Sequence, residues 1–478
     1  MKKDISKLPK VNFKLEENAL ERKALLDKIE SFTEEYLETL PSQKAFYYNT
    51  HPATEADSFF AIENDSNSLD DVLGFFNDRV LKTGLNPTSG GHLGYIPGGG
   101  IFSAALGDYL AAITNRYAGE FYASPGAVRI EDAVIDWTGK LIGFTKGFGG
   151  NLTSGGSIAN LIALHTAKHH KNISADNIHQ SVVYSTSQTH HSILKAIKII
   201  GLEGCVIREI PMDSKFRISA EALKTQLILD EQIGLKPFLL IANAGSTDVG
   251  AVDPLLELAG ICKAHNLWFH VDAAYGGFFM LTDQGKERLR GIELADSVIL
   301  DPHKGLFLPY GSGIVLVKNQ DHLAAAHSYT ANYMRDAHIE GQYSPSNLSP
   351  ELSKHFRGLR MWLPLKLYGE KVFSDYLDEK LQLTCYLHKE LLTIGYQVVC
   401  EPDLSVVAFR LELDGYDSEE LNKMVLDYIQ KDGRIFISST VLDNKLTLRA
   451  AILSFRTHKE EIDLFLHLLK EVKDNLQL

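Results

Sequence analysis

Cysteine is scarce in this 478-residue chain, which contains only Cys205, Cys262, Cys385 and Cys400. No two of them form a Cys-x-x-Cys pair, so the sequence indicates neither a disulfide framework nor a zinc knuckle. Unpaired cysteines are typical of the reducing cytoplasm, where we expect the protein to reside. The basic N-terminal stretch leads into no apolar segment of signal-peptide length, so we do not expect export.

Long apolar runs and an excess of positive charge are also missing. The longest apolar stretches, Pro237–Ala244 and Trp268–Leu281, are interrupted well before the roughly 18 residues that a membrane span requires, so no membrane partner is expected. The chain has 48 Lys and Arg against 61 Asp and Glu, a net charge of −13. No basic surface for nucleic acid is therefore expected, and a small anionic ligand would need a site of its own.

The length predicts about three domains at roughly 150 residues each. Apolar residues at helical spacing predict an amphipathic helical arm over residues 12–40 and a further helix over 69–81. Residues 89–100 read SGGHLGYIPGGG, and six glycines in so short a stretch exclude regular structure. That segment is either a surface loop or a backbone that closely approaches a ligand.

Short apolar runs alternate with helical stretches between residues 181 and 319. The runs are Ser181–Ser185, Val206–Ile210, Phe238–Ala242, Trp268–Asp272, Ser297–Leu300 and Gly313–Val317. This alternation predicts an α/β fold with a mainly parallel sheet flanked by helices. Ligands of such sheets bind outside the carboxyl ends of the strands.

The remaining pattern predicts a lid and a second core. Residues 327–353 have little periodicity and fit a long lid loop, and helices are expected over 361–376 and 379–392 before a small C-terminal α+β domain. We therefore predict an N-terminal helical arm that clasps a dimer partner (1–100), a large α/β domain (101–355) and the small C-terminal domain (356–478).

A possible phosphate site begins at Thr153, where TSGGSIANLIALHTAK passes from small residues into a helical pattern. Gly156 and Ser157 stand at the start of this helix, where free N–H groups and the positive dipole end favour anions. The stretch matches neither the P-loop nor the dinucleotide-binding fingerprint. Taken alone, it is equally compatible with a capped helix that binds nothing.

Two apolar runs end in side chains suited to catalysis. FHVDAAYGG places Asp272 at a strand end, where a buried carboxylate needs a cationic or hydrogen-bonding partner. SVILDPHKG ends in His303 and Lys304, and a partly desolvated lysine can form a Schiff base. Together with the phosphate site, this predicts pyridoxal 5′-phosphate, which needs an anion anchor, a carboxylate for its ring nitrogen and an amine. In QTHHS, His190 could lie over that ring, and His191 fits the spacing equally well.

In this order and spacing, TSGGS, HVDAAY and PHK resemble the group II pyridoxal-phosphate-dependent amino acid decarboxylases of the aromatic-L-amino-acid decarboxylase type, over roughly residues 69–455. The resemblance implies a fold type I architecture, similar to PLP-dependent transferases, with a seven-stranded sheet. It also implies a homodimer with the site at the subunit interface. The resemblance implies that Lys304 forms the covalent bond to the cofactor and that Asp272 pairs with its ring nitrogen. It implies that His190 stacks on the ring and that Thr247 and Ala274 pack against it. The phosphate would be held by Gly156, Ser157 and His303.

The same resemblance implies decarboxylation of an L-amino acid to its amine. Tyr333 in the lid best matches the tyrosine that protonates the substrate Cα, and Tyr329 is the competing candidate. Aromatic substrates are favoured because Tyr95 and Pro97 match the pocket segment of those relatives, which need no pocket cation. Arg449 lies in a segment that the family shares, where a structural ion pair and a substrate contact both remain open.

Several departures and alternatives accompany this interpretation. Gly305 and Ile158 replace a common Trp and Glu, and Ile96 and Gly98 replace an aromatic residue and a threonine of the pocket segment.

The alternatives are a decarboxylase for glutamate or another amino acid, a sphingosine-phosphate-lyase-like enzyme and an aldehyde-forming oxidative decarboxylase. No metal is expected, since the histidines between His165 and His170 lack further ligands in register and are interpreted as a solvated helix face.

Overall fold

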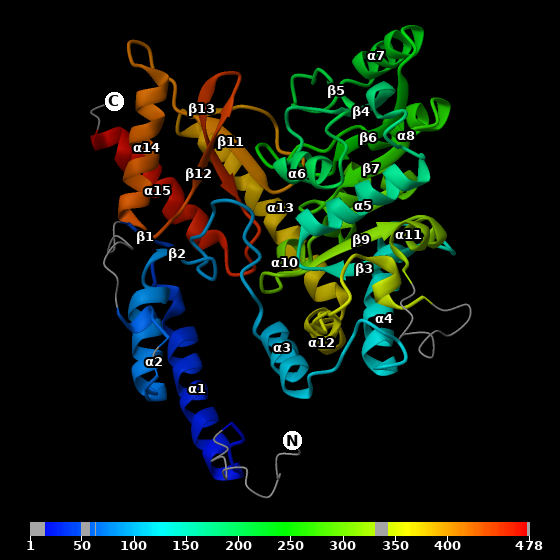
Figure 1. Cartoon of the computed structure of the whole chain (residues 1–478). Coiled ribbons are helices and arrows are strands. Elements are labelled where there is room, and N and C mark those ends of the chain that lie inside the picture. Colours follow the sequence, from blue (N-terminus) through cyan, green and yellow to red (C-terminus); the bar gives the residue numbers. More distant parts are fainter. Residues whose placement is uncertain (1–14, 49–57, 63, 330–342, 476–478) are drawn as a thin grey trace, which may run out of the picture.

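The computed structural model describes residues 15–48, 58–62, 64–329 and 343–475, and its core is a seven-stranded sheet (Figure 1). The strand order is β3-β9-β8-β7-β6-β4-β5. The bounds are β3 Gly149–Thr153, β4 Ser181–Ser185, β5 Val206–Glu209, β6 Lys236–Asn243, β7 Trp268–Asp272, β8 Ser297–Leu300 and β9 Gly313–Val317. Strands β4 to β8 are parallel, and β9 pairs antiparallel with both β8 and β3, which confirms the predicted mainly parallel α/β sheet. The predicted runs omitted β3, because its sequence GGNLT has a single large apolar side chain.

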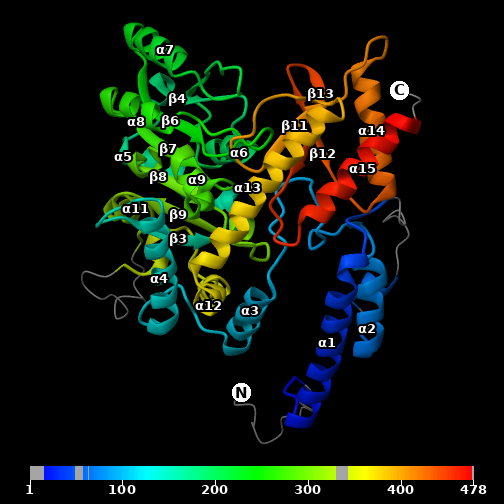
Figure 2. The same cartoon turned by 180° about the vertical axis from the view of Figure 1, so that it is seen from behind.

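Alternate strand residues enter two separate cores on the two faces of the sheet. Val183, Ile241 and Ile299 pack beneath α5 (Gly156–His170), α6 (His191–Ile199) and α11 (Gln320–His327). On the other face Tyr184 and Leu240 pack with α4 (Pro125–Leu141), α7 (Ala220–Gln232) and α8 (Leu255–Ala264). Figures 1 and 2 show helices on both sides of the sheet. Since helices cover both faces, the ends of the strands are where polar side chains can face a cavity.

The C-terminal part forms a second core around a four-stranded antiparallel sheet of order β10-β11-β13-β12. Its elements are α12 Gly358–Tyr368, α13 Glu370–Thr393, β10 Gln397–Val398, β11 Val406–Arg410, α14 Ser418–Asp432, β12 Ser438–Leu442, β13 Lys445–Ala451 and α15 Lys459–Asn475. The predicted helix bounds 361–376 and 379–392 are wrong. The chain turns at Gly369, where φ is 73°, and α13 then continues unbroken to Thr393. Apolar spacing alone does not reveal such a turn, whereas the glycine marks it.

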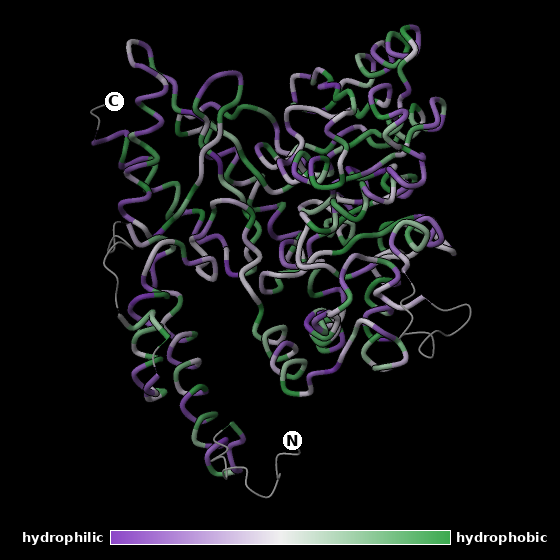
Figure 3. Tube along the Cα trace, viewed as in Figure 1, coloured by the Kyte–Doolittle hydropathy of each residue, from purple (hydrophilic) through white to green (hydrophobic). Residues whose placement is uncertain are grey.

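An N-terminal arm extends away from both cores in Figures 1 and 2. It consists of α1 (Ala19–Thr39), which Asn18 begins with a capping box, and α2 (Leu69–Phe76), which continues as one wide turn to Leu81. No residue of α1 or α2 is buried, and Figure 3 shows hydrophobic and hydrophilic residues interspersed along both helices. Apart from contacts between the two helices, such as that of the Phe32 and Phe76 rings, many apolar residues of the arm are exposed in the described part of the chain.

The glycine-rich segment 89–100 runs between the arm and α3 (Phe102–Thr114), beside the short pair β1 (Phe46–Tyr47) and β2 (Gly84–Leu85). Most of its residues are buried, so the surface-loop interpretation is wrong. A Cβ at position 98 would lie 2.0 Å from the carbonyl oxygen of His303, so only glycine permits this approach. The segment also joins the small sheet, since Leu93 N–H donates to the Phe436 carbonyl at 2.8 Å. The proposed divisions at residues 100 and 355 stay a prediction.

Candidate active site

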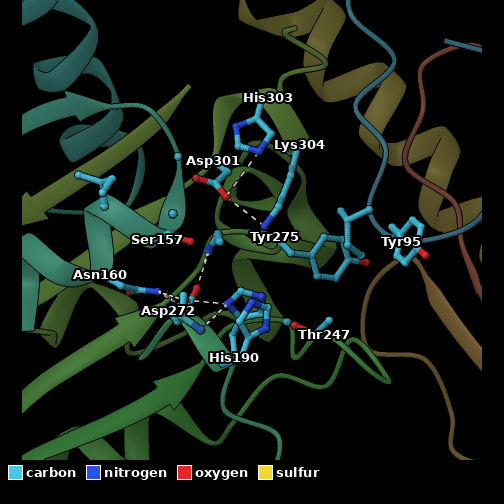
Figure 4. Close-up of a pocket in the computed structure, with 18 of the residues that line it drawn as sticks. Tyr95, Ser157, Asn160, His190, Thr247, Asp272, Tyr275, Asp301, His303 and Lys304 are labelled. Carbon is cyan, nitrogen blue, oxygen red and sulfur yellow. Dashed lines mark hydrogen bonds and ion pairs between the residues drawn. The ribbon is translucent and has the colours of Figure 1, made fainter. Parts of the chain in front are cut away.

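A cavity of about 600 Å³ lies at the carboxyl ends of β6, β7 and β8, and the small sheet closes one side of it (Figure 4). Nine of the residues predicted from sequence line it: Tyr95, Gly156, Ser157, His190, Thr247, Asp272, Ala274, His303 and Lys304. Pro97 is buried and does not line the cavity; its neighbour Ile96 does. Tyr333 lies outside the described residues, and Tyr329, just after α11, is 85% exposed.

The anion end of the cavity is the start of α5. Gly155 precedes the helix with φ 153° and ψ 175°, a conformation that essentially only glycine adopts. The first helical bonds are donated by Ile158 and Ala159 to the Gly155 carbonyl, so the N–H groups of Gly156 and Ser157 have no helical partner. These two groups can therefore bind a phosphate.

Lys304 and His303 follow β8 and share one carboxylate. Lys304 Nζ lies 3.0 Å from Asp301 Oδ2, and His303 Nε2 lies 3.8 Å from the same oxygen. His303 Nδ1–H donates to the Ser312 carbonyl, so this ring can offer a second N–H, at Nε2, only when it is positively charged. Burial lowers the pKa of His303 and Asp301 opposes that shift. A phosphate beside the ring would favour its charged form.

Asp272 ends β7 and is 8% exposed. It accepts hydrogen bonds from Asn160 Nδ2 at 2.9 Å and from Ala274 N–H at 3.1 Å. Among the described residues it forms no ion pair. A buried carboxylate without a cation is costly, and a protonated ring nitrogen of a ligand would offset that cost.

Both candidate histidines line the cavity, with ring centroids 4.1 Å apart. His190 is half-buried and precedes α6, with its Nδ1 2.7 Å from Ser192 Oγ, whereas His191 is exposed. Burial lowers the pKa of His190, and the nearby Asp272 carboxylate opposes that shift. Ser192, at the start of α6, therefore holds the His190 ring in place, which the spacing could not have shown.

The sequence left the role of Arg449 open and did not single out Asn160 or Asp301. Arg449, on β13, is 3% exposed and lines the cavity opposite the large sheet. Its Nη1 donates to Ser438 Oγ at 3.1 Å, but its Nε and Nη2 are buried without a hydrogen-bond partner among the described residues. A polar residue within an apolar helical run could have flagged Asn160. Arg449 had no comparable signal, because the small domain brings it to the site.

The histidines of α5 are not simply solvated. The His165 ring packs 4.8 Å from His327, and the His170 ring packs 3.9 Å from His322, both on α11. Across the described ranges, no three or more His, Cys, Asp or Glu side chains are grouped to hold a metal ion. The histidines instead help α5 to pack against α11.

The residues present fit pyridoxal phosphate. Gly156 and Ser157 offer N–H groups, Lys304 offers an amine, and Asp272 offers a carboxylate that lacks a cation. Asp301 Oδ1 is also buried without a hydrogen-bond partner among the described residues. Each group matches one requirement of the cofactor.

Comparisons with known proteins agree with this chemistry. The model of the pyridoxal-dependent decarboxylase conserved domain matches residues 59–412. Aromatic-L-amino-acid decarboxylase of Bacillus atrophaeus is 35% identical over 84% of this chain and 85% of its own length. Phenylacetaldehyde synthase of Arabidopsis thaliana is 30% identical over 80% of this chain and 82% of its own. The crystal structure of Catharanthus roseus tryptophan decarboxylase with L-tryptophan shares the fold, with a TM-score of 0.87 and 24% identity over 96% of this chain and 99% of that one.

Proposed function

This chain belongs to the pyridoxal-phosphate-dependent decarboxylase family, and from that premise we propose that it converts an aromatic L-amino acid into the corresponding amine and carbon dioxide. It is a carboxy-lyase that depends on pyridoxal phosphate. When bound, this cofactor supplies the electron sink for breaking the bond between Cα and the carboxylate. The observation that carries the proposal is the convergence of Lys304, Asp272 and the α5 N-terminus on one cavity.

The large domain supplies the residues that bind and orient the cofactor. The N–H groups of Gly156 and Ser157 would hold its phosphate, and Lys304 Nζ would be the amine that attaches it. The Asp301 carboxylate lies 3.0 Å from Lys304 Nζ and orients that amine. The Asp272 carboxylate, which Asn160 orients, would hold a proton on the ring nitrogen and so keep the electron sink strong.

The small domain supplies a cation for the substrate. Arg449 has two buried donors free for an anion, and an amino acid always brings an α-carboxylate. Arg449 is the only arginine that lines the cavity among the described residues. A glutamate-like substrate would need a second cation for its distal carboxylate, so a single arginine favours a substrate with a neutral side chain. Tyr95 and Ile96 offer an apolar wall to an aromatic one.

A panel of the common amino acids tests this function, with carbon dioxide, amine, aldehyde and peroxide measured for each. We expect carbon dioxide and amine in equal amounts from tryptophan, tyrosine or phenylalanine, and little from glutamate. The variant Lys304→Ala is the control, because any carbon dioxide that it still releases does not come from this site. Aldehyde with peroxide would replace the proposal by oxidative decarboxylation, and no release from any amino acid would defeat it.

We also propose a homodimer in the cytoplasm. The arm exposes Leu25, Leu26 and Ile29 on α1 and Val72 and Phe76 on α2, each at least 40% exposed, and a second copy of the chain would cover them. Four free thiols support a reducing compartment. In the described residues no helix is both long and apolar enough to cross a bilayer. Analytical sedimentation of the wild type should give the mass of a dimer. Leu26→Asp should raise the monomer fraction, whereas the control Leu367→Asp, on α12, should not. An unchanged monomer fraction in Leu26→Asp would count against the arm as the interface.

A further inference from the structure

A directed chain of hydrogen bonds lies behind Asp272, inside the large domain. Trp268 Nε1 donates to Ser297 Oγ at 2.8 Å, and that oxygen lies 2.9 Å from His270 Nδ1. His270 Nε2 lies 2.9 Å from Asn160 Oδ1, and Asn160 Nδ2 donates to Asp272 Oδ2 at 2.9 Å. None of the four residues behind Asp272 is more than 2% exposed.

The fold places these groups together for a simple reason. Trp268, His270 and Asp272 alternate along β7 and therefore point to the same face of the sheet. Ser297 pairs with His270 in the register of β7 and β8, and α5 covers that face and brings Asn160.

The two ends of this hydrogen-bonded series, Trp268 and Asp272, fix the direction of every hydrogen bond between them. The indole of Trp268 can only donate and the carboxylate of Asp272 can only accept. Asn160 must therefore turn its NH₂ toward Asp272 and its oxygen toward His270, so His270 carries its proton on Nε2. Burial lowers the pKa of His270 to about 4, which keeps this ring neutral. Its Nδ1 then accepts from the Ser297 hydroxyl.

A second branch from Asn160 reaches His190. Asn160 Nδ2 also donates to Ser192 Oγ at 3.1 Å, and Ser192 Oγ lies 2.7 Å from His190 Nδ1. The Ser192 backbone N–H points at the same nitrogen, at 3.3 Å. With two donors aimed at Nδ1, the neutral His190 ring carries its proton on Nε2.

We propose that Asn160 is a positioning residue that holds the Asp272 carboxylate ready for the protonated ring nitrogen of the cofactor and, through Ser192, sets the tautomer of His190. His270, Ser297 and Trp268 hold the Asn160 amide in the required orientation. The inference rests on the cofactor of the family and not on the identity of the amino acid.

The test compares pyridoxal phosphate with its 1-deaza analogue, in which carbon replaces the ring nitrogen, by fluorescence titration of the apoprotein. Asn160→Leu should weaken pyridoxal phosphate binding by about 10-fold to 100-fold, because it removes a hydrogen bond to a charged group. It should change the affinity for the deaza analogue less than about twofold, since that ring offers Asp272 no cation. The control is Thr166→Val, which removes another buried polar group of α5 and should change neither affinity.

Two further variants keep the test decisive if Asn160→Leu does not fold. Asn160→Ala removes the same NH₂ donor to Asp272 without placing a large apolar side chain beside His270, so it should also reduce the preference for pyridoxal phosphate. Ser192→Ala should keep that preference and change the ring-nitrogen signals of ¹⁵N-labelled His190. Equal weakening of both cofactors, or of neither, would overturn the proposal. These affinities are measured without an amino acid, so they do not depend on whether the protein is a decarboxylase. A wild-type protein that binds neither cofactor would overturn the cofactor assignment and this proposal with it.

Discussion

The two walls of the cavity differ in how their polar groups are satisfied. On the wall from the large sheet, Asp272 and Asn160 are bonded on both sides by groups of the same domain. On the wall from the small sheet, Arg449 keeps two buried donors without a described partner, and Tyr95 is 57% exposed. The first wall is organised for a cofactor before it binds, and the second still needs an anion. The comparison teaches that the Asp272 carboxylate is oriented by a preformed hydrogen-bond network, whereas Arg449 keeps its donors for an anion that comes and goes. On the cofactor side, the start of α5 and Asp301 Oδ1 are also left open among the described residues, in their case for the cofactor.

The largest effect is expected on the cofactor wall. Lys304→Ala should lower turnover by more than about a thousandfold, because it removes the nucleophilic amine. The measurement is amine release together with borohydride reduction and peptide mapping, which should label Lys304 in the wild type alone. Lys286→Ala, which removes an exposed lysine of a surface ion pair, is the control. Labelling of another lysine would reassign the site.

The second-largest loss of activity is expected from Tyr333, in the predicted lid loop, which lies outside the described residues. Tyr333→Phe should lower amine formation by about 100-fold, the usual contribution of a general acid. Tyr329→Phe is the matched variant, and amine and carbon dioxide should be followed in both. Unchanged amine formation in Tyr333→Phe, with a loss in Tyr329→Phe, would move the acid to Tyr329.

On the substrate wall, Arg449→Met should raise KM for the amino acid by about 10-fold to 100-fold, since it removes charge-assisted bonds to the α-carboxylate. Cofactor affinity should not change, and this outcome separates the two walls. Thermal stability should stay the same or rise, because the variant no longer buries unpaired donors. Weaker cofactor binding in this variant would show that the walls are not independent.

The smallest expected effect is on the pH dependence of stability, and it concerns His92, which differs from the equally buried His270. Both nitrogens of His270 are bonded, whereas His92, stacked 5.4 Å from Phe436 behind Tyr95, has no described partner for Nδ1. Burial lowers the pKa of His92 to about 4, below its unfolded value near 6.5. Its contribution to stability is therefore fully present above pH 6.5 and lost as the pH falls toward 4.

His92→Phe should flatten this decline, by about 1–3 kcal/mol between pH 6.5 and 4, because the ring stays and the titration disappears. Denaturant unfolding at several pH values measures it. His467→Gln, at an exposed position on α15, should leave the slope unchanged. An unaltered slope in His92→Phe would show that the ring is not desolvated in solution.

Much of the cofactor wall could be predicted from local sequence. Asp272 and Lys304 follow apolar runs that are long enough to be strands, and parallel strands bring their carboxyl ends to one edge. Pro97 shows the limit, because a residue next to the wall in sequence turns away from the cavity, and only Ile96 and Tyr95 reach it. The turn at Gly369 and the edge strand β3 were missed for a related reason, since apolar spacing reveals neither a glycine turn nor a strand with a single large apolar side chain.

The sequence by itself determined every strand of the large sheet except β3, and it predicted the cofactor and nine of the residues that line the cavity, because strand periodicity and strand-end polar groups are local properties. Only the tertiary structure decided that Arg449, from another sheet, faces Asp272 across one cavity. It alone decided that His270 and Ser297 align behind Asn160, since register and helix placement join residues more than a hundred positions apart. Hydrogen-bond direction follows from such neighbours, and no local pattern encodes it.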